Sequence, residues 1–112
     1  MASPKPISAP RPRQRLSEPE SIAHERGPDG GRYALRRDGA EAELTYQIAS
    51  PDLILADHTG VPDAMRHTGA GAALVKRMVE DARAGGYHIR PTCPFVEAMR
   101  NRHPDWADAF ES

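Results

Sequence analysis

The segment of residues 66–95, RHTGAGAALVKRMVEDARAGGYHIRPTCPF, decides the fold because it passes from a loop through a helix to a strand. From residue 71 onward, apolar side chains recur at helical spacing and charged side chains take the opposite side, which predicts an amphipathic helix. Gly85 and Gly86 predict the end of this helix, and residues 87–90 predict a short strand directly after it. The segment therefore predicts a helix that returns the chain to a sheet.

Turn residues divide the preceding part of the chain into strands. Residues 27–31 predict a turn, and an Asp-Gly turn joins the predicted strands 32–37 and 42–49 into a hairpin. A third strand is predicted at 53–61, and its apolar first half predicts burial on both faces. These three strands form an antiparallel meander.

The order of strand, helix and strand around the quoted segment places 53–61 and 87–90 side by side and parallel. After Cys93 the pattern predicts short helices, with Trp106 and Phe110 as a small helical lid over the core. We therefore expect an α+β fold with a mixed, mostly antiparallel sheet, one long helix and short C-terminal helices.

The composition narrows the classes of function. A chain of 112 residues has room for one domain, and its 15 basic and 16 acidic side chains give no general attraction to nucleic acid or to an anionic membrane. The single cysteine cannot form an internal disulfide, the histidines lack metal-site spacing, and no apolar run approaches the roughly 20 residues of a membrane helix. We expect a cytoplasmic protein that uses no metal, nucleic acid or membrane.

The first 21 residues differ from the rest of the chain. They hold five prolines, several basic residues and almost no large apolar side chains, so they cannot bury enough surface to offset the entropy of ordering. Residues 1–21 are therefore expected to form a disordered Pro/Arg-rich tail, and residues 22–112 the folded domain.

The loop before the helix has the composition of a phosphate site. Arg66, Gly69 and Gly71 lead into the first helical turn, where backbone N–H groups can converge on an anion at the positive end of the helix. The glycines leave room for close approach, and Arg66 can add a charge-assisted hydrogen bond. Neither common nucleotide loop is present, because no Gly-Lys-Ser/Thr follows and the three-glycine fingerprint is incomplete. A tight loop that only packs the helix is the alternative.

Three motifs in this order resemble the small, single-domain Gcn5-related N-acetyltransferases. They are a His-Thr-x-Val strand end at 58–61, an Arg-x-x-Gly-x-Gly loop at 66–71 and a Cys-Pro-Phe segment at 93–95. The resemblance runs from about Arg32 to the C-terminus. It implies transfer of an acetyl group from acetyl-CoA to a primary amine, and a sheet whose two parallel strands splay apart to admit the pantetheine arm.

The resemblance also implies the residues that surround the co-substrate. The pantetheine arm would lie along His58, Thr59 and Val61, the pyrophosphate among Arg66, Gly69, Ala70, Gly71 and Ala72, and the thioester beside Cys93, Pro94 and Phe95. The chain departs from the family at Gly60, where an acidic residue is frequent, so the role of that carboxylate is missing or moved. His67 and Thr68 also make the loop bulkier than in relatives.

Cys93 and His58 are the candidate catalytic residues. Pro91 ends a strand and Pro94 suits the first residue of a helix, so Cys93 is predicted as the N-cap, where unpaired N–H groups favour the thiolate. Either an amine attacks acetyl-CoA directly, or Cys93 first accepts the acetyl group, or Cys93 is a small buried residue without a role. His58 is the candidate for orienting the site or accepting a proton; the alternative is a hydrogen-bonded histidine at a strand end.

Two other classes of function stay open at this point. The chain shows almost no acceptor side, so a module that binds acyl-CoA without catalysis is the main alternative. An interaction protein that acts through the Pro/Arg-rich tail is the second. The sequence specifies neither the acceptor nor the oligomeric state.

Overall fold

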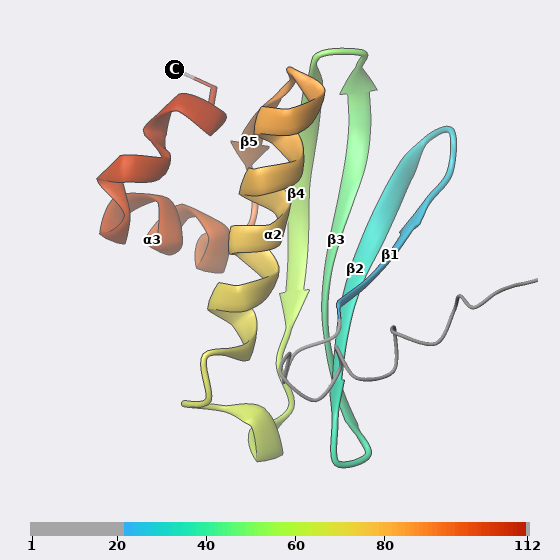
Figure 1. Cartoon of the computed structure of the whole chain (residues 1–112), viewed down its shortest axis with the longest axis vertical. Helices are drawn as coiled ribbons and strands as arrows, with labels where there is room; N and C mark the ends of the chain where they lie inside the picture. The colour runs from blue at the N-terminus through green and yellow to red at the C-terminus, as the bar shows by residue number, and fades with distance from the viewer. Residues whose placement is uncertain (1–21, 112) are drawn as a thin grey trace, which may run out of the picture.

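In the computed structural model, which describes residues 22–111, a five-stranded sheet forms the centre of the fold (Figure 1). The strands lie across the sheet in chain order and are β1 (Ile22–Arg26), β2 (Gly30–Arg37), β3 (Ala40–Ser50), β4 (Leu53–Gly60) and β5 (His88–Pro91). Neighbouring strands from β1 to β4 are antiparallel, whereas β4 and β5 are parallel. The predicted mixed sheet is confirmed. The predicted tail at 1–21 lies outside the described residues.

The four described helices are the short 3-10 helix η2 (Asp63–Met65), the long helix α2 (Ala70–Gly85), α3 (Pro94–Arg102) and the 3-10 helix η3 (Pro104–Ala109). Three of them follow the order that the sequence predicts, whereas η2 lies in a segment predicted as a loop. α2 buries its apolar stripe, including Leu74, Val75 and Met78, against the sheet. It ends as predicted, because Gly86 is left-handed at φ 75° and donates its N–H to the Ala82 carbonyl at 2.9 Å. Among the described helices, none is long and apolar enough to cross a membrane.

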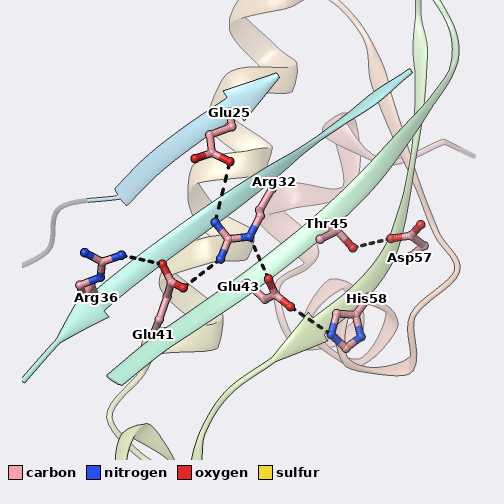
Figure 2. Close-up of polar contacts among 8 residues, drawn as sticks. All are labelled: Glu25, Arg32, Arg36, Glu41, Glu43, Thr45, Asp57 and His58. Atoms are coloured by element: carbon pink, nitrogen blue, oxygen red, sulfur yellow. Dashed lines mark hydrogen bonds and ion pairs between the residues drawn. The ribbon is translucent and has the colours of Figure 1, made fainter. Parts of the chain in front are cut away.

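Helices cover only one face of the sheet, so the expectation that residues 53–56 are buried on both faces is wrong. Ile54 and Ala56 are 2% and 0% exposed, whereas Leu53 and Leu55, which point to the other face, are only partly buried. Figure 1 shows α2 and α3 together on one side of the sheet. We call the other side the open face; its polar side chains include Arg32, Glu41, Glu43, Thr45, Asp57 and His58 (Figure 2).

The N-terminal edge of the sheet differs from the prediction, which has no strand at 22–26 and a turn at Gly30. β1 is mostly polar, and its pairing is supported by a tertiary contact in which the His24 ring stacks on Tyr33, with centroids 4.1 Å apart. A Cβ at Gly30 would lie 2.3 Å from the Tyr46 carbonyl oxygen. Glycine is therefore needed at this position for the close approach of two strands.

The C-terminal segment covers the core, but with a different backbone from the one predicted. Trp106 and Phe110 are both buried, as expected for a lid. Trp106 lies in the 3-10 helix, whereas Phe110 follows it and forms a parallel bridge with Ile89 of β5. The expectation of a single helical lid is therefore wrong for Phe110, because the edge of β5 supplies backbone partners that a further helical turn would forgo.

Candidate functional site

The two parallel strands part near their carboxyl ends. Their pairing ends at Ala56 and Pro91, although Thr92 still donates its N–H to the Ala56 carbonyl at 2.9 Å. β4 continues through residues 57–60, while the chain after β5 turns into α3. One backbone edge of β4 therefore faces a gap and not a neighbouring strand, which confirms the expected splay.

A β-bulge at Asp57 interrupts the alternation of side chains at this edge, so that Asp57 and His58 both lie on the open face. Thr45 of β3 pairs with His58, but the next residue of β3 pairs with Ala56, so Asp57 is an additional residue on β4. The Asp57 carboxylate accepts a hydrogen bond from the Thr45 hydroxyl at 2.7 Å on the open face (Figure 2). Beyond the bulge, His58 points to the open face and Thr59 to the helix-covered face.

A pocket of about 660 Å³ lies beside the gap, on the helix-covered face. Its walls are the end of β4, the loop that carries Arg66, the first turn of α2 and one side of α3. This volume falls within the range of small-molecule and cofactor sites. The pocket therefore has room for an elongated ligand that also reaches the gap.

The N-terminus of α2 forms one end of this pocket. Gly69 is the N-cap, and the first intrahelical hydrogen bond runs from the Ala73 N–H to the Gly69 carbonyl at 2.9 Å. No side chain caps this helix, and its first turn carries no acidic residue. The N–H groups of residues 70–72 are thus available at the positive end of the helix, which is the arrangement that binds phosphate groups.

The two glycines of the loop have different tasks. Gly69 has φ 84°, and a Cβ there would meet nothing within 4 Å, so this position requires glycine for its left-handed backbone. A Cβ at Gly71 would lie 2.7 Å from Phe95 Cζ and 3.4 Å from Val61 Cγ2. Phe95, and not a phosphate, therefore occupies the space beside the Gly71 Cα. The absence of a side chain at this position allows α3 to pack closely against α2.

Basic side chains stand on both rims of the pocket. Arg66 lies on the loop rim, where its side chain is 63% exposed and its Nε is 3.1 Å from Asp63 Oδ1. Arg102 and His103 lie on the rim formed by the end of α3. An exposed ion pair such as Arg66–Asp63 contributes little free energy, so Arg66 is free to turn toward an anionic ligand.

Cys93 is the N-cap of α3, as predicted, with an extended backbone at φ −107° and ψ 131°. The thiol is 7% exposed, and its sulfur lies 3.6 Å from the Thr59 hydroxyl oxygen on the helix-covered face. Burial by itself raises the pKa of Cys93, but the backbone of Val96 and Phe95 at the helix start and the Thr59 hydroxyl outweigh it, so the pKa is lowered. The site therefore favours a thiolate beside the gap.

His58 lies on the opposite side of the sheet from Cys93. Its side chain is 58% exposed on the open face, and its Nε2 is 3.5 Å from Glu43 Oε2 (Figure 2). The two candidate catalytic residues thus contact different neighbours on different faces. They do not form a Cys–His pair of the kind that activates a nucleophile.

The comparison with known families agrees with this geometry. The family described as GCN5-related N-acetyl-transferase matches residues 32–109, a range that includes the loop, the gap and both candidate catalytic residues. This chain belongs to the GCN5-related N-acetyltransferase family. The resemblance carried by the three sequence motifs is therefore confirmed at the level of the family.

A solved structure shares the fold of this acetyltransferase. The NMR solution structure of a GCN5-like candidate N-acetyltransferase from Staphylococcus aureus matches it with a TM-score of 0.62 and 29% sequence identity, covering 80% of this chain and 88% of that chain. No curated protein matched the sequence. Family and fold together support acetyl transfer as the class of activity.

The structure brings most of the expected co-substrate residues of the acetyltransferase into one pocket. The lining includes Thr59, Val61, Arg66, Gly69, Ala70, Gly71, Ala72 and Phe95. It does not include His58, whose side chain lies on the open face, nor Cys93, which contacts Thr59, nor Pro94. Within residues 22–111, no three His, Cys, Asp or Glu side chains are grouped closely enough to hold a metal ion.

Sequence reasoning missed lining residues in two places. Met65 and His67 come from the segment before α2, and Met99, Arg102 and His103 come from α3 and its C-cap. The available signal was the spacing of Phe95, Met99 and Arg102 at i, i+4 and i+7, which places all three on one side of a helix. Only the packing of α3 against α2 shows that this side faces the ligand.

Proposed function

We propose that this acetyltransferase transfers the acetyl group of acetyl-CoA to a primary amine. The observation that supports this most directly is the continuity of the site. An uncapped helix N-terminus with a basic rim opens into a pocket, and that pocket leads to a gap between parallel strands. A long ligand with a phosphate end and a thioester end fits such an arrangement.

In this proposal the α2 end of the site holds the pyrophosphate. The N–H groups of residues 70–72 donate to it, Gly69 keeps the approach open, and Arg66 adds a charge-assisted hydrogen bond. The pantetheine arm then pairs with the free backbone edge of β4 at His58, Thr59 and Val61, as a strand would. Its thioester end lies in the gap, beside the Cys93–Phe95 segment.

The amine approaches the thioester from the open face. It arrives as an ammonium ion and loses one proton to the imidazole of His58. The neutral amine then attacks the thioester carbonyl, and a backbone N–H at the free edge of β4 stabilises the oxyanion. As the tetrahedral adduct collapses, the C–S bond breaks, the sulfur of CoA takes up a proton, and the nitrogen loses its second proton to become an amide.

In this proposal Cys93 lies on the helix-covered face, the side of the sheet on which acetyl-CoA binds. Its thiol is almost completely buried and contacts Thr59, while the acceptor side of the sheet carries His58. We therefore assign direct attack by the amine as the route, with Cys93 packed beside the thioester. An acetyl group found on Cys93 during turnover would indicate that the reaction proceeds through a covalent acetyl-cysteine and not by direct attack.

The proposed function is tested by CoA release. Purified full-length protein is incubated with acetyl-CoA and a panel of amines: a peptide with a free N-terminus, an Nα-blocked lysine and spermidine. Release of CoA that depends on one of these amines, with the acetylated amine found by mass spectrometry, is the expected result.

Two other outcomes would contradict the proposal. Calorimetric binding of acetyl-CoA without turnover of any amine would indicate the non-catalytic module. The second outcome concerns binding to a partner protein. If deletion of residues 1–21 abolished that binding while a bulky residue at Gly71 left it unchanged, the protein would be an interaction protein that acts through its tail.

A further inference from the structure

We infer that Glu43 is a positioning residue for His58, and that Gly60 leaves the space in which its carboxylate reaches the imidazole. This inference rests on the proposed function, because it assigns a partner to the residue that accepts the proton of the amine. Glu43 lies on β3, outside the three motifs that mark the family, so no pattern around residues 58–95 points to it.

The carboxylate of Glu43 is held in place from one side and presented to His58 from the other. Its Oε1 accepts a hydrogen bond from Arg32 Nε at 2.9 Å, and its Oε2 lies 3.5 Å from His58 Nε2. Figure 2 shows the three side chains in a line across β2, β3 and β4. Arg32 and Glu43 are partly shielded, with side chains 31% and 34% exposed, whereas His58 is 58% exposed. The orientation of the carboxylate is therefore restrained before a ligand arrives.

Gly60 provides the space for this contact. Gly60 is the register partner of Glu43 on the neighbouring strand. A Cβ at position 60 would lie 3.3 Å from His58 Nε2, 3.7 Å from Glu43 Cγ and 3.9 Å from Glu43 Oε2. An acidic side chain on β4 and the carboxylate of Glu43 on β3 would thus occupy the same place beside the imidazole. With glycine at 60, the carboxylate comes from the adjacent strand.

The contact between Glu43 and His58 determines which imidazole nitrogen of His58 can accept a proton. A carboxylate beside Nε2 favours the tautomer that carries its proton on Nε2, which leaves the lone pair of Nδ1 for the proton of the incoming ammonium ion. The imidazolium that forms when that proton is taken up lies beside this carboxylate, and the proton then passes to water. Glu43 itself does not contact the acceptor amine, and its carboxylate stays ionised throughout.

The other charged side chains on this face do not substitute for Glu43. Those drawn with it in Figure 2 are Asp57 of β4, Arg32 and Arg36 of β2, Glu41 of β3 and Glu25 of β1. Asp57 is engaged by Thr45 and Gln47, at 2.7 and 2.8 Å. Glu41 binds the guanidinium groups of Arg32 and Arg36 at 3.0 and 3.3 Å.

The test is a double-mutant cycle in the full-length protein with acetyl-CoA and the best amine of the panel. Glu43→Gln should lower kcat about tenfold with unchanged affinity for acetyl-CoA, whereas His58→Gln should lower it about 100-fold. In the His58→Gln background, Glu43→Gln should have no further effect. Glu41→Gln, which removes a neighbouring carboxylate from the same face, is the matched control and should keep the activity of the unmodified protein.

A gain-of-function variant completes the experiment. Gly60→Asp is placed in the Glu43→Ala background, because a glutamine at 43 would still fill the space beside the imidazole. There it returns a carboxylate to the side of His58 and should recover most of the kcat lost in Glu43→Ala. Additive losses in the cycle, an equal loss in Glu41→Gln, or a Glu43→Ala loss that follows thermal stability and is not recovered by Gly60→Asp would each overturn the role of Glu43. Absence of amine-dependent CoA release by the unmodified protein would instead refute the proposed function, and the inference with it.

Discussion

The two faces of the sheet differ in almost every physical property. The helix-covered face is apolar, with Ile54 and Ala56 buried beneath the helical layer, and it carries the pocket and the thiol of Cys93. The open face carries a network of ion pairs centred on Arg32, and His58 belongs to it. The end of β4 contributes to both faces: the bulge places Asp57 and His58 together on the open face, and Thr59 then points to the helix-covered face.

Under the proposed function, this difference places the two substrates on two sides of the sheet. A large phosphate-bearing co-substrate needs the concave pocket and the helix N-terminus. A small cationic acceptor needs an accessible surface and a proton acceptor, and those lie on the open face. Substitutions on the two faces should therefore change different kinetic quantities.

The largest effect is expected at His58. His58→Gln should reduce kcat by about 100-fold or more, because it removes the proton acceptor for the amine. The affinity for acetyl-CoA should not change, since the side chain points away from the pocket. Steady-state CoA release and calorimetry separate the two quantities, and His88→Gln, an exposed histidine on β5, is the control. A weaker affinity with unchanged kcat would show that the two faces are not separated as proposed.

The converse effect is expected at Arg66. Arg66→Ala removes one charge-assisted hydrogen bond to phosphate and should weaken acetyl-CoA binding by about 10- to 100-fold. At saturating acetyl-CoA, kcat should be retained. Arg100→Ala, which removes an arginine that pairs with Glu97 on α3, should leave binding unchanged. A fall in kcat at saturation would contradict the assignment of Arg66 to binding alone.

The two glycines of the loop should respond differently to the same substitution. Gly71→Ala should destabilise the protein by about 1–3 kcal/mol, because its methyl group would collide with Phe95, and Phe95→Leu should recover part of this loss. Gly69→Ala should be destabilising by about 1 kcal/mol through its left-handed backbone, and Phe95→Leu should not help. Denaturant unfolding measures both. If Phe95→Leu restored stability to both Gly71→Ala and Gly69→Ala, the two substitutions would destabilise the protein for the same reason, which would contradict this prediction.

Cys93 should matter little for turnover. Cys93→Ala should lower kcat less than about threefold, because direct attack by the amine does not use the thiol. Intact-protein mass spectrometry after incubation with acetyl-CoA should find no acetyl group on the unmodified protein. An adduct that depends on Cys93, together with loss of turnover in the variant, would establish the covalent route and move the chemistry to the helix-covered face.

The smallest effect concerns His24, a partly buried histidine on the helix-covered face. The pKa of His24 is lowered from its ordinary value of 6.5, mainly because burial disfavours the charged imidazole, although Asp81 acts in the other direction. The unfolded chain therefore binds more protons than the native protein, so this contribution to stability is present above pH 6.5 and declines as the pH falls below it. Thermal unfolding of His24→Gln should show a weaker dependence on pH in that range. An unchanged dependence would exclude His24 as its source.

Local patterns predicted the parts of the fold that depend on neighbouring residues. The apolar stripe of α2, its end at Gly86 and the N-cap position of Cys93 follow from helical spacing and from the backbone preferences of glycine and proline. The parallel pair follows from the rule for strand, helix and strand connections. The strand β1 was not predicted because its mostly polar sequence contains no strand signal; the contact that supports its pairing, His24 stacked on Tyr33, joins two strands and is visible only in the structure.

The sequence by itself determined the family, the mixed sheet and the loop at the start of α2, because each depends on motifs or periodicities within a short stretch of chain. The tertiary structure alone decided on which face each side chain acts. A one-residue bulge reverses the alternation of a strand, so no count along the sequence could place His58 beside Glu43 and Thr59 beside Cys93. It likewise decided that Gly71 serves the packing of Phe95, since that contact joins two helices that the sequence keeps apart.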